Sequence, residues 1–421
     1  MKTPFKTLMA AAIAACMTPG AMADQGPVPT GVEPLDRVFV VMMENHGYAE
    51  VVGNPDMPFF NRLAKSSALA TGYFAVAHPS LTNYLEIVGG SNFGVINDHS
   101  PDWHNGSCQT NLSTGMPSLD ESSFPNICPL QGGGTDSATP AIDLSNLEGN
   151  NPGPVLNIDG NASYQAAHTV ALSIAHQLVA SGRTWKAYEE SLPPSGADGI
   201  NNADGLFSSG PSTNANPPSA SGISDAVVDL YAVKHDPFAY FLDIENGSDK
   251  RLSLARIVGF DGEHGLFSDL ASGHVPNFSF IAPNQCNDQH GRSGAGPQCD
   301  GDPNDVGTLT GLNPALMYQG DVALERIVGA IRSSPVWKQG HNAIVIVWDE
   351  SDYSNAPITN QVALLVTTNA GGEEGRTSGR FYTHFSLLKS IEAGFGLPCL
   401  NHACDAGTAV MTDLFSRGDS R

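Results

Sequence analysis

The sequence has few positively charged residues. Of its 421 residues, 20 are Lys or Arg, against 43 Asp or Glu, which gives a formal net charge of −23. A surface this negative repels the phosphates of nucleic acids and the headgroups of anionic lipids. We therefore expect no nucleic-acid partner, and any phosphate chemistry would need a metal ion or a local positive pocket.

Long apolar runs are also missing. Beyond the first residues, no stretch reaches the roughly 20 apolar residues that a membrane-spanning helix requires, so we expect no transmembrane segment. At the start of the chain, Lys2 and Lys6 precede an apolar stretch that ends at Cys16, and the small-residue sequence Ala21-Met22-Ala23 follows. We interpret residues 1–23 as a signal peptide for export to the periplasm or the medium. A competing interpretation makes Cys16 the acylated residue of a lipoprotein.

Cysteine is sparse and never spaced as CxxC, which argues against a cysteine-based metal site. There are 7 cysteines, and an even number remains if Cys16 leaves with the signal peptide. An even number in an exported chain favours disulfides. Proximity in sequence suggests the pairs Cys108 with Cys128, Cys286 with Cys299, and Cys399 with Cys404. Other connectivities stay open.

Several well-known signatures are absent. There is no P-loop, no GxGxxG before a helix and no GxSxG elbow, so nucleotide-dependent transfer and serine-esterase chemistry are both disfavoured. Residues 300–305 imitate the start of a calcium loop, but they lack a Gly at the sixth place, and Gly311 stands where the loop needs Glu.

The apolar content, 41% of the residues, is that of a globular protein, and two continuous apolar runs predict central strands. Residues 37–43 and 343–348 show no alternation, which suits parallel strands covered by helices on both faces. Further strands are predicted at 275–282 and 362–367. Apolar spacing at three and four predicts helices at 58–66, 80–88, 168–180, 321–331 and 385–395. The predicted class is α/β with a mostly parallel sheet.

Tracts rich in Gly, Pro, Asn and Ser interrupt these elements. The longest lie near residues 131–162 and 193–224. Because predicted strands stand on both sides of them, we interpret them as loop insertions in one domain rather than as linkers. That single catalytic domain would span residues 24–421.

Polar residues follow both central strands. Glu44 and Asn45 come after the first, and Asp349 and Glu350 after the second. Ligands of open parallel sheets bind beyond the carboxyl ends of the strands, and carboxylate and amide oxygens are ligands for a hard cation. Each group alone could be a strand-end cap or a solvated turn. Together they predict a divalent metal site of unknown metal and number of ions.

Ser80 stands just after a proline, at the start of a predicted helix. A hydroxyl there lies near free backbone N–H groups and the positive end of the helix dipole, which stabilise an alkoxide and an incoming phosphate. The alternative is a helix cap, with the Ser80 hydroxyl accepting from the N–H of Asn83.

Three further residues could act on phosphate. Asp288 and His290 follow a predicted strand beside a cysteine, where they could form a second metal position or bind phosphate; a rigid surface loop is the alternative. His384 stands just before a helix and could bind phosphate or a metal, although a lone histidine is often structural.

Seven short motifs occur in order between about residues 36 and 400. They are residues 42–46 (MMENH), 78–84 (HPSLTNY), 184–190 (TWKAYEE), 234–238 (KHDPF), 286–290 (CNDQH), 348–350 (WDE) and 382–388 (YTHFSLL). Together they resemble the phosphoesterase family, which includes bacterial phospholipases C and secreted acid phosphatases and belongs to the alkaline-phosphatase-like superfamily. The resemblance implies that superfamily's fold.

The resemblance also implies roles. Ser80 would be the nucleophile that takes the phosphoryl group and passes it to water. The metal ligands would be Glu44, Asn45, Asp349 and Glu350. Asn97 would steady a phosphate oxygen, and His384, Asp288 and His290 would bind phosphate, protonate the leaving group or hold a second ion.

The chain departs from the family pattern at some positions. Thr82 stands where many relatives have proline, and the fuller His/Asp set of two-zinc alkaline phosphatases is missing. The sequence after Ser80 also lacks the motif of a sulfatase. Because the chain is short of the extra C-terminal domains of long phospholipase relatives, we expect an acid-phosphatase-like monoesterase acting on a phosphorylated small molecule or lipid. A phospholipase C-type diesterase and a noncatalytic phosphate-binding protein are the alternatives.

Overall fold

The computed structural model describes residues 25–93, 95, 98, 172–192, 230–241, 243–244, 247–351, 360–371 and 375–415. It adds the backbone of four short strands, β4 (Gln109–Thr110), β5 (Ile127–Cys128), β6 (Ala141–Ile142) and β7 (Ser163–Tyr164). The predicted signal peptide, Asn97, the pair Cys108–Cys128 and, apart from β6, the two predicted insertions lie outside the described residues.

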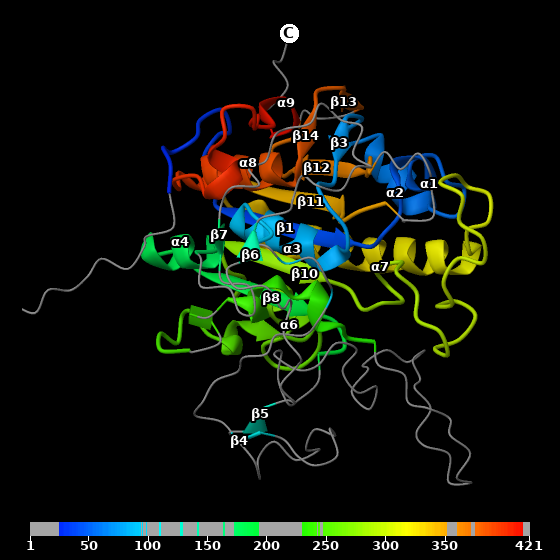
Figure 1. Cartoon of the computed structure of the whole chain (residues 1–421), viewed down its shortest axis with the longest axis horizontal. Coiled ribbons are helices and arrows are strands. Elements are labelled where there is room, and N and C mark those ends of the chain that lie inside the picture. Colours follow the sequence, from blue (N-terminus) through cyan, green and yellow to red (C-terminus); the bar gives the residue numbers. More distant parts are fainter. Residues whose placement is uncertain are drawn as a thin grey trace, which may run out of the picture.

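An eight-stranded sheet forms the centre of the molecule, in the order β13-β2-β12-β11-β1-β10-β8-β9. The strands are β1 (Arg37–Met43), β2 (Ala68–Ala70), β8 (Trp185–Glu189), β9 (Ile257–Val258), β10 (Phe278–Ala282), β11 (Asn342–Trp348), β12 (Leu364–Thr368) and β13 (Arg376–Ser378). β11, β1, β10, β8 and β9 run parallel, and β12 runs antiparallel to both of its neighbours. In Figure 1, β12, β11, β1, β10 and β8 follow one another from top to bottom.

Both faces of the sheet are covered. Every residue of β11 is buried, and in β1 only Arg37 is partly exposed. Because successive side chains of a strand point to opposite faces, this pattern requires packing on both sides. The predicted α/β class with a mostly parallel sheet is confirmed.

The helices form two packed groups. One contains α3 (Ser80–Gly89), α4 (Ile174–Ala180) and α8 (His384–Phe395); the other contains α2 (Pro58–Ala64), α6 (Leu266–Ser272) and α7 (Pro314–Ser333). Short elements complete the described fold: α1 (Tyr48–Val51), α9 (Thr412–Phe415), β3 (Tyr73–Phe74) and β14 (Tyr382–Thr383), and the 3-10 turns η2 (Val233–His235), η3 (Pro237–Tyr240), η4 (Leu254–Arg256), η5 (Pro335–Lys338) and η6 (Asn401–Cys404).

α7 is longer than the sequence predicted. The apolar spacing placed a helix at 321–331, whereas α7 begins at Pro314, where the Asn313 side chain accepts a hydrogen bond from the Ala315 N–H. Asparagine as cap and proline in the first turn are a standard helix start. In the first turns the apolar residues Tyr318 and Val322 lie on the exposed side of the helix. The apolar residues there therefore do not mark a single face, which explains why the start was misplaced.

Two disulfides are present among the described residues. Cys286 pairs with Cys299, and Cys399 with Cys404, as predicted. Disulfides fit an oxidising compartment. None of the helices in the described ranges combines the length and the apolar character needed to cross a membrane.

Candidate functional site

The two acidic segments meet at one edge of the sheet. Met43 and Trp348, the last residues of β1 and β11, are register partners, and the Asp349 N–H donates to the Met43 carbonyl at 3.0 Å. Glu44 therefore lies beside Asp349 and Glu350, although some 300 residues separate them in sequence. All three are buried.

The Ser80 hydroxyl lies between two of these carboxylates. Its Oγ is 3.1 Å from Glu44 Oε2 and 3.1 Å from Glu350 Oε1. Ser80 is the first residue of α3, Pro79 precedes it as the N-cap residue, and among the described residues the Ser80 hydroxyl binds carboxylates rather than a backbone N–H of the helix. The alternative of a simple capping serine is therefore wrong. The hydroxyl instead points at the acidic edge of the sheet.

Other polar side chains hold Glu350. Its Oε2 lies 2.6 Å from His78 Nδ1 and accepts from Asn83 Nδ2 at 3.3 Å. Asp349 is different: it is fully buried, and within the described part of the chain neither of its carboxylate oxygens has a well-formed hydrogen bond, although nearby Ser80 acts to lower its pKa.

Burial makes the charged form of these carboxylates unfavourable. Burial raises the pKa of Glu44 to about 7, although the nearby Lys234 opposes the rise. Burial also raises the pKa of Asp349 well above its usual range, and that of Glu350 to a smaller extent. Buried carboxyls that repel one another must bind protons or a cation. The arrangement therefore fits a divalent cation, which would lower these pKa values again.

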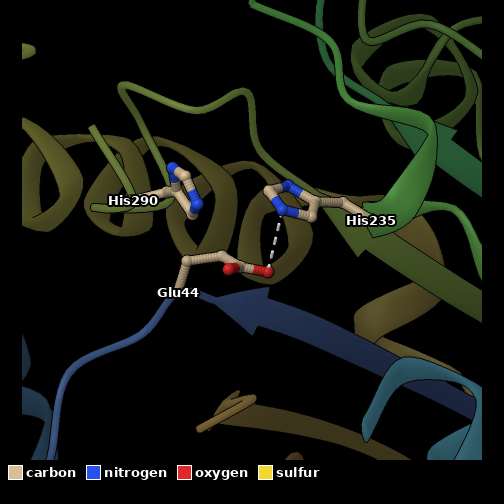
Figure 2. A group of neighbouring side chains, drawn as sticks. All are labelled: Glu44, His235 and His290. Atoms are coloured by element: carbon tan, nitrogen blue, oxygen red, sulfur yellow. Dashed lines mark ion pairs between the residues drawn. The ribbon is translucent and has the colours of Figure 1, made fainter. Parts of the chain in front are cut away.

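Two histidines face Glu44 from another direction. Glu44, His235 and His290 place one ligand atom each within 4.8 Å of one another, so these three side chains could hold a metal ion. Figure 2 shows Glu44 at the end of β1 with both imidazole rings on the same side of it. His235 bridges two carboxylates, with Nε2 3.2 Å from Glu44 Oε1 and Nδ1 3.3 Å from Asp288 Oδ2. Burial lowers the pKa of His235 well below its usual range, which leaves a neutral ring suited to a metal.

The loop after β10 is fastened to the same edge. The Asp288 carbonyl accepts from the Glu44 N–H at 2.8 Å, and Asp288 Oδ1 accepts from the His290 N–H at 2.7 Å. Both residues lie between the disulfide partners Cys286 and Cys299. The predicted pair Asp288 and His290 is thus part of the site, and the alternative of a plain surface loop does not apply.

Opening this disulfide is expected to weaken the site. The Cys286→Ala/Cys299→Ala variant should lose about 2–3 kcal/mol of unfolding free energy, because the bond restrains the unfolded chain, and its KM should rise as Asp288 and His290 loosen. The Cys399→Ala/Cys404→Ala variant is the matched control, since the loop it closes contains no candidate site residue. Urea unfolding and steady-state kinetics of both variants check this. Equal effects on KM would contradict it.

A lysine brings positive charge to the acidic edge. Lys234 Nζ lies 3.0 Å from Asp98 Oδ2 and 3.2 Å from His290 Nε2. The other oxygen of Asp98 accepts from the Leu81 N–H at 3.1 Å. Lys234 is buried, with 7% of its surface exposed.

The remaining predicted residues differ in position. His384 is fully buried; its Nε2 lies 2.6 Å from the Asp349 carbonyl and its Nδ1 2.8 Å from the Tyr73 hydroxyl. Burial lowers the pKa of His384 to about 4. Both ring nitrogens of His384 therefore already have polar partners. Asn45 is half-buried beside Glu44, and Asn97 lies outside the described residues.

Four residues of the site had been given no role from the sequence: His78, Asp98, Lys234 and His235. Three of them lie in motifs that the sequence analysis identified. His78 belongs to the motif that carries Ser80, and Lys234 and His235 open the motif at residues 234–238. Asp98 had no such signal, because only the folded chain brings its carboxylate to Lys234.

His46 connects the end of β1 with a neighbouring loop, and its Nδ1 lies 3.0 Å from the Glu44 carbonyl. Its Nε2 lies 2.8 Å from Asp302 Oδ2, and Asp302 Oδ1 accepts from the Asn313 N–H. Burial by itself would lower the pKa of His46, but the hydrogen bond and the charge of Asp302 outweigh it and raise the pKa to about 9. The pair ties the loop before α7 to the end of β1.

The stabilisation from this pair should depend on pH. Because the folded pKa is above the unfolded value of about 6.5, the stabilisation is complete below pH 6.5 and is lost as the pH rises through 9. Asp302→Asn should cost about 2–3 kcal/mol at pH 6 and much less at pH 10. Urea unfolding at both values measures this. Glu325→Gln, which breaks the exposed pair with Arg62, should cost under about 1 kcal/mol at either pH, and a pH-independent cost of Asp302→Asn would contradict the assignment.

Comparisons with known proteins agree with the motifs. The model of the Phosphoesterase family matches residues 54–298. A phosphatidylinositol-3-phosphatase of Mycobacterium tuberculosis is 23% identical over 398 residues, which cover 94% of this chain and 88% of that protein. An acid phosphatase of Aspergillus fumigatus is 22% identical over 89% of this chain, which spans only 58% of that longer protein.

Among solved structures, one similar protein is a member of the alkaline phosphatase superfamily from Vibrio parahaemolyticus. It is 11% identical, with a TM-score of 0.44 over 91% of this chain and 72% of that one.

Proposed function

The chain belongs to the Phosphoesterase family, and on that premise we propose that it hydrolyses phosphate monoesters through a phosphoserine at Ser80, with the help of a divalent cation. It is a hydrolase of phosphoric esters. The observation that carries the proposal is the Ser80 hydroxyl at the start of α3, 3.1 Å from each of two buried carboxylates.

Glu44, Asn45, Asp349 and Glu350 would hold the cation. Among the described residues the Asp349 carboxylate has no well-formed hydrogen bond, and the pKa of Glu44 is raised; both observations support this assignment. Such a cation lowers the pKa of a nearby hydroxyl and neutralises charge on the transferring phosphoryl group. His384, which contacts the Asp349 carbonyl, is a positioning residue in this proposal.

The first half of the reaction forms the phosphoserine. The Ser80 proton passes to one of the carboxylates that accept from it, and Oγ attacks phosphorus in line with the leaving oxygen. The new bond joins Oγ to phosphorus, the ester bond breaks, and the alcohol leaves with a proton. The positive end of the α3 helix dipole stabilises the charge on the phosphoryl oxygens.

His290 is the proposed source of the leaving group's proton. Burial, together with the charge of Lys234, lowers its pKa to about 3 in the free enzyme. In the free enzyme the Nδ1 of His290 lies 2.9 Å from the Gly291 carbonyl, and its Nε2 lies 3.2 Å from Lys234 Nζ. A bound phosphate dianion would attract the ammonium group away from Nε2, favour the imidazolium form and raise this pKa, so that Nε2 carries a proton only with substrate in place. In the second half of the reaction the ring takes a proton from the attacking water, whose oxygen bonds to phosphorus. The bond between Oγ and phosphorus breaks, phosphate leaves, and the carboxylate returns its proton to Oγ.

The names of the relatives favour monoesters. The mycobacterial protein is a phosphatidylinositol-3-phosphatase and the fungal one an acid phosphatase. A phosphorylated small molecule or a lipid monophosphate is the proposed substrate class. A phospholipase C-type diesterase remains the alternative.

We also propose that the chain is exported, with residues 1–23 as its signal peptide. The support is the pair of disulfides at Cys286–Cys299 and Cys399–Cys404, which suit an oxidising compartment.

The test is hydrolysis of a chromogenic phosphate monoester and of the matching diester between about pH 4 and 9, on chelated and on metal-reloaded protein. Monoester hydrolysis that a divalent cation restores is the expected result. Faster hydrolysis of the diester would move the chain to the phospholipase alternative, and phosphate binding without hydrolysis of either ester would make it a binding protein.

A further inference from the structure

We propose that Lys234 selects phosphate monoesters over diesters by binding the second negative charge of a monoester dianion. This inference rests on the proposed function and names the residue that sets its substrate class. The motifs and the predicted metal ligands assign no role to this lysine.

The position of Lys234 relative to the nucleophile supports the proposal. Asp98 bridges the two: one carboxylate oxygen lies 3.0 Å from Lys234 Nζ, and the other accepts from the N–H of Leu81, the residue after Ser80. The ammonium group is therefore one carboxylate away from the start of α3. A phosphoryl group attached to Ser80 would place its oxygens in the same region.

The charges around Ser80 also indicate that the Lys234 ammonium group lies near the transferring phosphoryl group. Glu44 and Glu350 both contact the Ser80 hydroxyl, and the positive charge of Lys234 acts on both carboxylates. Since interactions between charges weaken with distance, an ammonium that acts on both also acts on a phosphoryl group between them.

Burial makes the charge effective. Lys234 is 7% exposed, so the surrounding water screens it little, and its attraction for an anion exceeds that of a surface lysine. In the free enzyme the ammonium group also lies 3.2 Å from His290 Nε2, and with substrate bound its contact with Asp98 holds it in place. The long side chain is fixed, and little conformational entropy is lost when substrate binds.

The two ester classes differ in charge. At neutral pH a phosphate monoester carries close to two negative charges, because its second pKa is about 6, whereas a diester carries one. A fixed cation beside the transferring group thus stabilises the monoester more. Asp98 holds the ammonium in place and is a positioning residue in this proposal.

Lys234→Met should remove the preference. We expect kcat/KM for the chromogenic monoester to fall about 100-fold, as on losing one group that stabilises transition-state charge, and kcat/KM for the diester to fall roughly fivefold or less. Lys234→Arg keeps the charge and should retain most of the preference. Lys186→Met is the matched control: Lys186 is also largely buried and paired with an aspartate, Asp269, and its loss should leave the monoester-to-diester ratio unchanged.

A binding measurement separates this role from a structural one. Inorganic phosphate should raise the melting temperature of the wild type more at pH 8, where it is a dianion, than at pH 5, where it is a monoanion. The difference should vanish in Lys234→Met and persist in Lys186→Met. If Lys234→Met does not fold, the arginine variant decides: a monoester preference retained within about tenfold supports the proposal, and its loss contradicts it.

The failures of the two proposals can be told apart. A wild type that does not hydrolyse the monoester removes the proposed function. A wild type that does, combined with a Lys234→Met variant in which both esters lose activity equally, overturns the role of Lys234 alone.

Discussion

Ser80→Ala is expected to lower kcat for phosphate monoesters by at least about 1,000-fold, as loss of the nucleophile does in enzymes with a covalent intermediate. The folded structure should persist, because the Ser80 hydroxyl caps no helix N–H among the described residues, where its hydrogen bonds go to Glu44 and Glu350. Steady-state kinetics on the metal-loaded variant, with circular dichroism as a check on folding, give the result.

A matched control lies two residues along the same helix. The Thr82 hydroxyl donates to the Pro79 carbonyl at 2.6 Å, so Thr82→Ala should cost about 1 kcal/mol of stability and leave kcat within about tenfold of the wild type. Full activity in Ser80→Ala, or an equal loss in both variants, would remove Ser80 from the nucleophile's role.

Removal of divalent cations is expected to have the second largest effect. Chelation should lower kcat/KM by at least about 100-fold, because the carboxylates at the ends of β1 and β11 would then repel the incoming phosphate, and one divalent metal should restore it. Asp349→Asn should raise the metal concentration needed for half-maximal activity. Asp413→Asn is the control, since the Asp413 carboxylate accepts from Ser378 and Tyr382, neither of which is a candidate site residue.

Stability provides a readout independent of catalysis. Since burial raises the pKa of Glu44 to about 7 from an unfolded value near 4.5, the folded chain without cation binds more protons between these values than the unfolded chain. Its stability should therefore fall as the pH rises from about 4.5 to 7. Adding the cation should reverse this loss. A metal-free protein whose melting temperature changes neither with pH nor on addition of metal would contradict the proposed site.

The sequence predicted the centre of the sheet well, because β1 and β11 are continuous apolar runs and both end in polar residues. It predicted no strand at β8, where the polar Lys186 and Glu189 interrupt the apolar pattern. Tertiary partners compensate for such residues: Lys186 pairs with Asp269 of α6. Contacts of this kind cannot be seen in a local pattern.

The candidate site likewise contains some residues that the sequence predicted and others that only the fold reveals. Glu44, Ser80, Asp349 and Glu350 stand at the ends of regular elements, where the chain direction predicts convergence. Lys234 and His235 lie in η2, a single 3-10 turn whose position is set by packing against α3. Nothing local in the sequence indicates that this turn reaches the end of β1. His384 was predicted to be catalytic, and only the structure reveals that both of its ring nitrogens are already engaged.

The most direct test of a phosphoserine is the stereochemistry at phosphorus. A thiophosphate monoester made chiral at phosphorus by sulfur and two oxygen isotopes would be hydrolysed by the metal-loaded protein in water that carries the third oxygen isotope. The configuration of the released thiophosphate would then be determined. Each in-line displacement inverts phosphorus, so attack by Ser80 followed by attack of water predicts net retention. Net inversion would mean that water attacks the substrate directly, and it would contradict the covalent role of Ser80.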